Sequence, residues 1–168
     1  MKRVMPRFVP LFLLLLWSTS APAQNWAGAL LRSHNSERAR WNVAPLAWDP
    51  GLARAADGYA AELARTNNWV HSPRQFRMGQ GENLWMGTAG AYSLQTMVGA
   101  WLAERRWFRP SVLPAVSATG RWNDVGHYTQ VIARRTTRVG CGVRSNRRWT
   151  YLVCRYSPAG NVDGRPSP

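Results

Sequence analysis

The apolar residues of this chain change their spacing along the sequence, and that change limits the folds open to it. Residues 26–40 and 50–63 space their apolar side chains as helices do, and a third such stretch begins near Ser93. β-Branched and aromatic residues then become frequent at 128–132, 138–143 and 149–156, which predicts strands. Helices followed by an antiparallel sheet indicate an α+β domain.

Local signals mark where several of these elements begin and end. Asp49 is a good helix N-cap and Pro50 suits the first helical position, so a helix is expected to start there. Residues 43–48 contain a proline and predict an extended connector, because the residue before a proline avoids the α conformation. Residues 145–148 are expected to form a hairpin loop between the last two strands.

The first two dozen residues have the three parts of a secretory signal peptide. Lys2, Arg3 and Arg7 precede a short apolar run at 8–17, and the small residues of 21–23 predict cleavage after the last of them. An uncleaved membrane anchor is the alternative. The run is too short for one, since a spanning helix needs roughly 20 apolar residues, and no second such run follows.

We therefore divide the chain into a signal peptide at 1–23, one domain at 24–160, and a loose tail at 161–168. The mature chain has the length of one domain with one core and keeps nine tryptophans, which favours a packed globule. Cleavage removes three basic residues and no acidic one, so the formal charge falls from +14 to +11. We expect a monomer without a transmembrane segment, either secreted or periplasmic.

Cys141 and Cys154 are the only cysteines. In an exported protein an isolated pair is typical of a disulfide, although two buried free thiols are the alternative. With the hairpin turn centred between Arg147 and Arg148, the two cysteines are directly opposite each other. We therefore expect a bridge between neighbouring strands.

Three histidines and two glutamates are the candidates for chemistry. His34 lies on a helix and is most simply structural, whereas His71 and His127 have other surroundings, His127 at the start of an expected strand. Glu104 falls on the apolar face of its helix, where a buried carboxylate is costly unless it is paired. Glu82 lies among glycines, which allow close approach of the backbone. From spacing alone, an exposed glutamate at the edge of each apolar run is the favoured interpretation.

Five sequence strings, in this order, resemble the CAP superfamily of cysteine-rich secretory proteins, antigen 5 and plant pathogenesis-related 1 proteins. The strings are at 31–38, 45–49, 81–84, 126–131 and 151–161. The most specific are Gly-His-Tyr-Thr-Gln at 126–130 and Cys-x-Tyr-x-Pro-x-Gly-Asn at 154–161. The resemblance covers nearly the whole mature chain.

This resemblance implies a three-layer α-β-α sandwich with a central antiparallel sheet and a cleft that holds two histidines and two glutamates. Matched motif by motif, these are His71, Glu82, Glu104 and His127. In several family members the histidines hold a divalent metal such as zinc, so His71 and His127 are the expected metal ligands. A purely structural hydrogen-bonded cluster is the alternative.

The chain also departs from the family pattern. Plant and animal members usually carry at least three disulfides, and this chain has cysteines for one. Ala133 stands where a tryptophan often follows, and a cysteine-rich C-terminal module is lacking, which removes support for the ion-channel role of venom members. The single bridge and the arginine-rich, lysine-free mature composition suggest a bacterial secreted member.

Two classes of function follow from the resemblance. The first is a binding protein for a lipid, a sterol-like molecule or a cell-envelope ligand. The second is a metal-dependent hydrolase, such as a protease or esterase, with Glu82 or Glu104 as the candidate catalytic base. Zinc enzymes generally use three protein ligands, and only two histidines are at hand unless a glutamate joins them. We therefore favour binding.

Arginines gather in three groups, which can be a solvated surface or a surface that binds an anionic envelope polymer or lipid head group. The groups are Arg105, Arg106 and Arg109, then Arg134, Arg135 and Arg138, then Arg144, Arg147 and Arg148. Charge alone also permits a nucleic-acid partner, but export argues against one.

Overall fold

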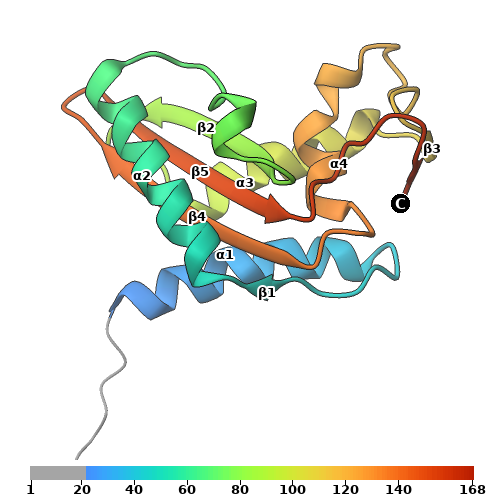
Figure 1. Ribbon diagram of the computed structural model, residues 1–168, viewed down its shortest axis with the longest axis horizontal. Coiled ribbons are helices and arrows are strands. Elements are labelled where there is room, and N and C mark those ends of the chain that lie inside the picture. Colours follow the sequence, from blue (N-terminus) through green and yellow to red (C-terminus); the bar gives the residue numbers. More distant parts are fainter. Residues whose placement is uncertain (1–21) are drawn as a thin grey trace, which may run out of the picture.

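The computed structural model describes residues 22–168, in which helices and strands alternate before a final hairpin (Figure 1). The helices and short 3-10 turns are α1 (Pro22–Ala39), α2 (Pro50–Thr66), η1 (Arg74–Phe76), α3 (Leu94–Ala103), η2 (Glu104–Trp107), η3 (Trp122–Asp124) and α4 (Gly126–Ile132). The strands are β1 (Ala47–Trp48), β2 (Gly81–Thr88), β3 (Ser111–Val112), β4 (Arg138–Ser145), β5 (Trp149–Ser157) and β6 (Pro166–Ser167).

The main sheet has the order β1-β4-β5-β2. Strands β4 and β5 form the expected antiparallel hairpin, and β2 pairs antiparallel with β5 along its whole length. The short β1 pairs parallel with β4, so the sheet is mixed and the expectation of a purely antiparallel sheet was wrong at this edge. The reason is that the extended connector leaving α1 runs alongside β4 in the same direction.

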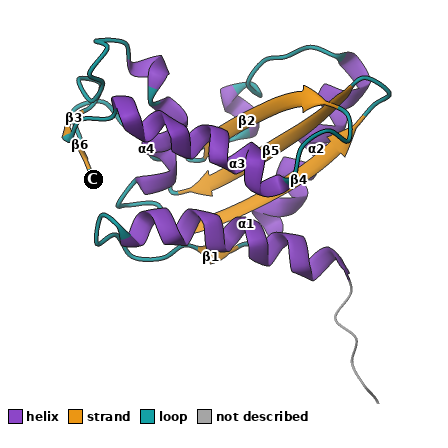
Figure 2. Cartoon of the chain, turned by 180° about the vertical axis from the view of Figure 1, so that it is seen from behind, coloured by secondary structure: helices purple, strands orange, loops and turns teal. Residues whose placement is uncertain are grey.

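Helices cover both faces of this sheet, which confirms the three-layer α-β-α arrangement. Helix α2 packs on β4 and β5, while α1 and α3 lie together on the opposite face (Figures 1 and 2). Alternate residues of β5 serve the two sides: Leu152 and Tyr156 join the core under α1 and α3, whereas Tyr151 and Val153 join the core under α2. This alternation is the period of two that a strand imposes.

The expected helix starts are confirmed by their capping bonds. The Asp49 carboxylate accepts hydrogen bonds from the amides of Gly51 and Leu52 at 2.8 and 2.9 Å, with Pro50 at the first helical position. The hydroxyl of Ser93 accepts from the amide of Thr96 at the start of α3. Each bond satisfies an amide that has no partner inside the helix.

Residues 126–132 form the helix α4, so the strand expected at 128–132 was wrong. All five residues from Tyr128 to Ile132 are buried, and the segment packs in a separate cluster with Phe108, Leu113 and Val125. A short apolar run buried on every side has no exposed face to reveal its period, so spacing cannot separate a strand from a helix.

The hairpin brings the two cysteines directly opposite each other, and Cys141 and Cys154 form the predicted disulfide. On the other face of β4, Gly140 and Gly142 let α2 lie against the strand. A Cβ at Gly142 would overlap the backbone of Asp57, and one at Gly140 would overlap that of Ala53. The missing side chains therefore set the distance between helix and sheet.

The two ends of the chain differ from each other in what the structure shows. The expected loose tail at 161–168 is partly ordered, because β6 pairs with β3 and Ser167 is buried. The predicted signal peptide covers residues 1–23. Residues 1–21 lie outside the described range, and its last two residues are at the start of α1. Among residues 22–168, we find no helix with the length and apolar character needed to cross a membrane.

Candidate functional site

Glu82 is the more deeply buried of the two glutamates expected in the cleft. It lies on β2, next to the segment 67–80 that connects α2 to this strand, and its side chain is fully buried. The amide and hydroxyl of Ser72 donate to its two oxygens at 2.9 and 2.8 Å, and Nδ1 of His71 lies 2.8 Å from Oε1. These partners hold the carboxylate in one orientation.

Arg155 balances the charge of Glu82. The register of the sheet places the two residues opposite each other on β5 and β2, on the face covered by α2. The guanidinium Nε lies 2.8 Å from Glu82 Oε2, and Nη2 donates to the Ser72 hydroxyl at 2.9 Å. Burial by itself would raise the pKa of Glu82, but the bond from His71, the charge of Arg155 and the bonds from Ser72 outweigh it and lower the pKa. Glu82 is therefore ionised at neutral pH.

Glu104 and His127 form a second pair with the same design. Glu104 follows α3 directly, and its Oε1 lies 2.6 Å from Nδ1 of His127 in the first turn of α4. The amide of Tyr128 donates to Oε2 at 3.0 Å. The indole of Trp101 stacks on the His127 ring with centroids 5.9 Å apart. Although the strand expected around His127 is a helix, the residue still meets Glu104.

Both pairs leave the same imidazole nitrogen free. A carboxylate only accepts hydrogen bonds, so Nδ1 of each histidine carries a proton, and in the neutral ring Nε2 is the nitrogen with the lone pair. The side chains of His71 and His127 are 51% and 34% exposed. Each histidine is thus oriented from behind by a glutamate, as metal-binding or proton-accepting histidines are.

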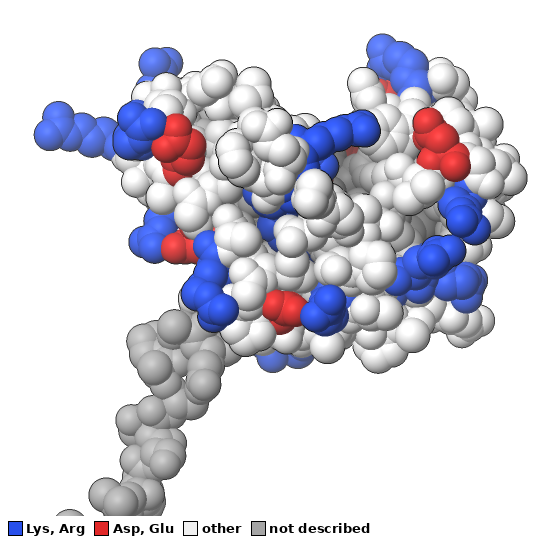
Figure 3. Space-filling model, viewed as in Figure 1, with Lys and Arg blue, Asp and Glu red and all other residues white. Residues whose placement is uncertain are grey.

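His71, Glu82 and His127 line one cavity of about 920 Å³, whose wall also includes Asn83 and Trp122. This face of the molecule is visibly hollowed (Figure 3). Glu104 is absent from the cavity wall and reaches it only through His127. Within residues 22–168, no group of three or more histidine, cysteine or acidic side chains is close enough to hold a metal ion.

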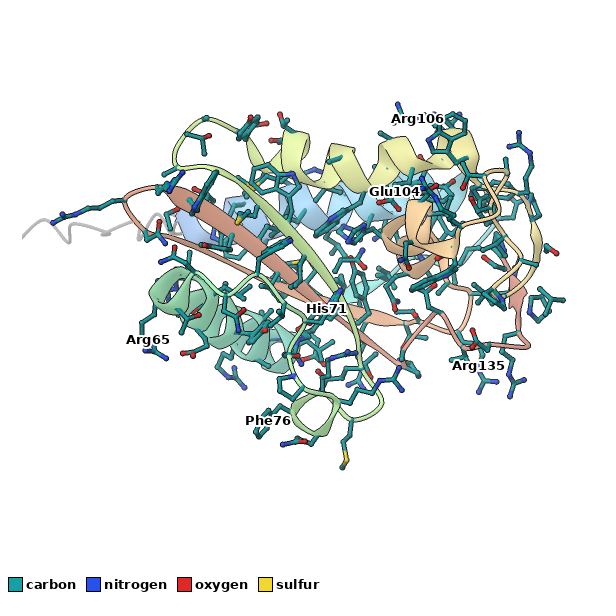
Figure 4. The ribbon with its side chains drawn as sticks, turned by 90° about the horizontal axis from the view of Figure 1, so that it is seen from above. Arg65, His71, Phe76, Glu104, Arg106 and Arg135 are labelled. Carbon is teal, nitrogen blue, oxygen red and sulfur yellow. A yellow bond between two sulfur atoms is a disulfide. The ribbon has the colours of Figure 1, made fainter. Side chains whose placement is uncertain are left out.

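A second cavity, of about 530 Å³, lies between α2 and the segment that follows it. Its lining is largely apolar and includes Tyr59, Leu63, Val70 and Phe76. His71 lines both cavities and is the only residue common to the two walls. Figure 4 shows His71 on the inner side of this segment and Phe76 at its outer edge.

Sequence reasoning did not identify Arg155, Ser72 or the second cavity. Arg155 had a usable signal: it lies in a strand between Cys154 and Tyr156, and alternation turns it toward the face that α2 covers. A cation on a covered face requires an anion, which could have pointed to Glu82. The cavity had no such signal, because it depends on the path of the segment after α2.

His34 lies apart from the cavity, as its structural interpretation predicts. Its Nδ1 donates to the carbonyl of Leu30 and its Nε2 accepts from the hydroxyl of Tyr156, both at 2.8 Å. Full burial lowers its pKa to about 4, so the ring is neutral. Asn83 donates to the same hydroxyl and to the carbonyl of His127, which connects this buried chain of bonds to the cavity wall.

Comparisons with known proteins identify the family. The family model of the cysteine-rich secretory protein family (CAP) matches residues 31–156. Pathogenesis-related protein 1B of Nicotiana tabacum is 36% identical over 156 residues, covering 92% of this chain and 88% of that protein. Pathogenesis-related leaf protein 4 of Solanum lycopersicum is 38% identical over 149 residues, covering 88% of this chain and 87% of that protein.

Solved structures show the same fold. The crystal structure of NaASP2 with Zn²⁺ has a TM-score of 0.71 and 25% identity, covering 83% of this chain and 82% of that one. The structure of BmVAL-1 has a TM-score of 0.65 and 23% identity, covering 92% and 85%. The family match extends over most of the chain and includes both histidine–glutamate pairs and the disulfide. This chain belongs to the CAP family of cysteine-rich secretory proteins.

Proposed function

We propose that this chain is an exported CAP protein that binds a small amphiphilic molecule, such as a lipid or a sterol-like compound, beside His71. One observation carries the proposal: His71 lines both the cavity of the histidine–glutamate pairs, which mixes polar and apolar groups, and the largely apolar cavity. A ligand that extends past His71 from one cavity into the other places its head group beside the histidine–glutamate pairs and its apolar part against α2.

The apolar cavity suits such a ligand in size and lining. Its volume of about 530 Å³ lies in the range of small-molecule sites. Tyr59, Leu63 and Val70 offer apolar contacts, and His71 and Ser72 are among the polar residues of the wall, which also include Glu62, Thr66 and Asn68. Burying an acyl chain there would stabilise the complex by roughly 0.8 kcal/mol for each methylene removed from water.

The proposal can be tested by introducing a large side chain on the wall of the apolar cavity, so that the side chain fills the cavity. Gly58 lines the cavity on α2, and a Cβ added to it would have no atom within 4 Å, so Gly58→Phe places a ring there without backbone strain. Gly99→Phe on α3 is the matched control, since Gly99 also has open space around it and lies on the opposite face of the sheet.

The probe is a dansyl-labelled undecanoic acid, with fluorescence titration as the measurement. We expect saturable binding by the wild type and by Gly99→Phe, and at least tenfold weaker binding by Gly58→Phe. Equal affinity in all three proteins, with unchanged circular dichroism, would rule out this cavity as the ligand site.

We also infer that His71 and His127 hold a divalent metal such as zinc. The donor set fits, because Nδ1 of each histidine contacts a glutamate, which leaves Nε2 as the nitrogen that can coordinate a metal. A metal held there would attract an anionic head group. With two protein ligands the affinity should be low, and the related NaASP2 structure, which contains Zn²⁺, supports the choice of metal.

Hydrolysis of an ester or peptide is the second candidate, favoured by the two carboxylate-backed imidazoles at one cavity wall. Zinc enzymes generally use three protein ligands, and residues 22–168 do not bring a third to these histidines. Binding therefore remains the better-supported function. Turnover of a fluorogenic ester library that is lost in His127→Ala would reverse this preference.

Export and an anionic partner complete the proposal. The match to a secretory family and the disulfide support a secreted or periplasmic location. Of the arginine groups, Arg105, Arg138 and Arg144 pair with Glu37, Asp49 and Asp57. Arg106 and Arg135 point outward from different parts of the molecule (Figure 4). Binding to an anionic envelope polymer should therefore be diffuse and should weaken steeply with salt.

A further inference from the structure

The turn between the two cavities exposes two large apolar side chains at its tip. Phe76 and Met78 are 73% and 81% exposed, more than any other large apolar residue among the described ones. Soluble proteins normally cover such groups, and neighbouring exposed apolar residues mark an interaction site more often than isolated ones do. The apolar cavity lies beside this tip, because Phe76 also lines that cavity.

The tip is held in a fixed shape. Within the turn, the amides of Phe76 and Arg77 donate to the carbonyls of Pro73 and Arg74 at 3.0 and 3.1 Å. The guanidinium of Arg77 donates to the carbonyl of Ser72 at 2.9 Å. On the other side, the amide of Ala159 donates to the carbonyl of Gly79 at 2.9 Å. A preformed apolar tip loses little conformational entropy when it binds.

The segment that carries the tip has charged residues of one sign. Residues 67–80 contain Arg74 and Arg77 and no aspartate or glutamate. Neither arginine forms an ion pair with a carboxylate among the described residues. Apart from Glu82, the acidic side chains on the walls of the two adjoining cavities are Glu62 and Asp163. These two arginines belong to none of the three groups described above.

We propose that this tip, Arg74 to Met78, docks on the surface of an anionic phospholipid bilayer. Phe76 and Met78 enter the boundary between head groups and acyl chains, and Arg74 and Arg77 contact the phosphates. Apolar insertion combined with arginines at head-group level is how amphipathic surface segments bind membranes. The apolar cavity then faces the bilayer, from which an amphiphile can enter it.

Vesicle co-sedimentation tests the proposal, with vesicles of 30% phosphatidylglycerol in phosphatidylcholine and of phosphatidylcholine alone. The protein is used as recovered from the producing cells, and intact mass confirms that every variant has the same N-terminus. We expect binding to the anionic vesicles only. Phe76→Ser with Met78→Ser should weaken it on the order of tenfold or more, and Arg74→Gln about fivefold.

Two controls change exposed residues elsewhere: Val112→Ser, at 49% exposed, and Arg106→Gln, on the opposite side of the molecule from Phe76 (Figure 4). Both should bind as the wild type does. If the double variant also binds unchanged, or if Arg106→Gln loses as much as Arg74→Gln, the tip is not the docking surface and diffuse charge explains the binding.

A second measurement reports insertion directly. Met78→Cys labelled with the dye NBD should brighten on anionic vesicles, whereas the same label at Val112→Cys should not. No change at position 78 would overturn the proposal. The inference stands apart from the proposed ligand site, since Gly58→Phe should weaken amphiphile binding at least tenfold and leave vesicle binding intact.

Discussion

The buried ion pair between Glu82 and Arg155 should govern the stability of the site. Their side chains are 0% and 3% exposed. Glu82→Gln keeps the shape of the side chain but leaves Arg155 as an uncompensated buried cation. Breaking a buried pair in this way costs about 3–5 kcal/mol, against a total stability of about 5–15 kcal/mol for a domain. We expect a loss in free energy of unfolding of that size.

The loss should depend on pH in a defined direction. The pKa of Glu82 is lowered in the folded protein, so its charge contributes stability that is fully present above the unfolded pKa of about 4.3. That contribution disappears as the pH falls through the lowered folded value. The difference between wild type and Glu82→Gln should therefore be largest near neutral pH and should shrink in acid.

Urea unfolding followed by circular dichroism, with the disulfide intact, measures these free energies. Arg155→Met and the double variant Glu82→Gln with Arg155→Met complete a double-mutant cycle. The double variant should cost at least about 2 kcal/mol less than the sum of the two single changes, because neither charge is then left alone. A cost below about 1 kcal/mol for Glu82→Gln, or simple additivity in the cycle, would refute this account of the pair.

Three further results are expected. Cys154→Ser should lower the free energy of unfolding by about 3 kcal/mol, from loss of the bridge across 13 residues; two free thiols in the denatured, unreduced wild type would show that the bridge is absent. Gly142→Ala should cost about 1–3 kcal/mol by forcing α2 away from β4, whereas Gly99→Ala, with open space around it, should cost nothing; equal effects in a urea titration would argue against the close approach. Calorimetry should detect weak zinc binding that fades in acid, because protons compete with the metal for the imidazole nitrogens, and that His71→Ala and His127→Ala remove; no saturable heat at millimolar zinc would contradict it.

Elements with an exposed face could be predicted from the sequence. The start of α2 and the opposition of Cys141 and Cys154 followed from capping residues and hairpin register, and both are confirmed. Helix α4 was mistaken for a strand because its residues are buried on all sides. Strand β1 depends on a parallel partner almost a hundred residues later in the chain, which no local pattern shows.

The candidate site shows the same division. The motifs indicated the histidines and glutamates, and the structure joins them as two separate pairs, His71 with Glu82 and His127 with Glu104. The motifs could not indicate the apolar cavity next to His71, because side chains of α2 and of the segment after it form this cavity. The bacterial origin suggested by the single disulfide stays a prediction.

The most direct test of the central claim is to locate the ligand by nuclear magnetic resonance. The protein is titrated with undecanoic acid while the imidazole signals of its histidines and the backbone amides are followed. We expect shifts at His71, Gly58 and Tyr59, around the cavity that they line, and none at Gly99. Shifts confined to α1 and α3, with His71 unmoved, would contradict the proposal that the amphiphile lies between α2 and His71.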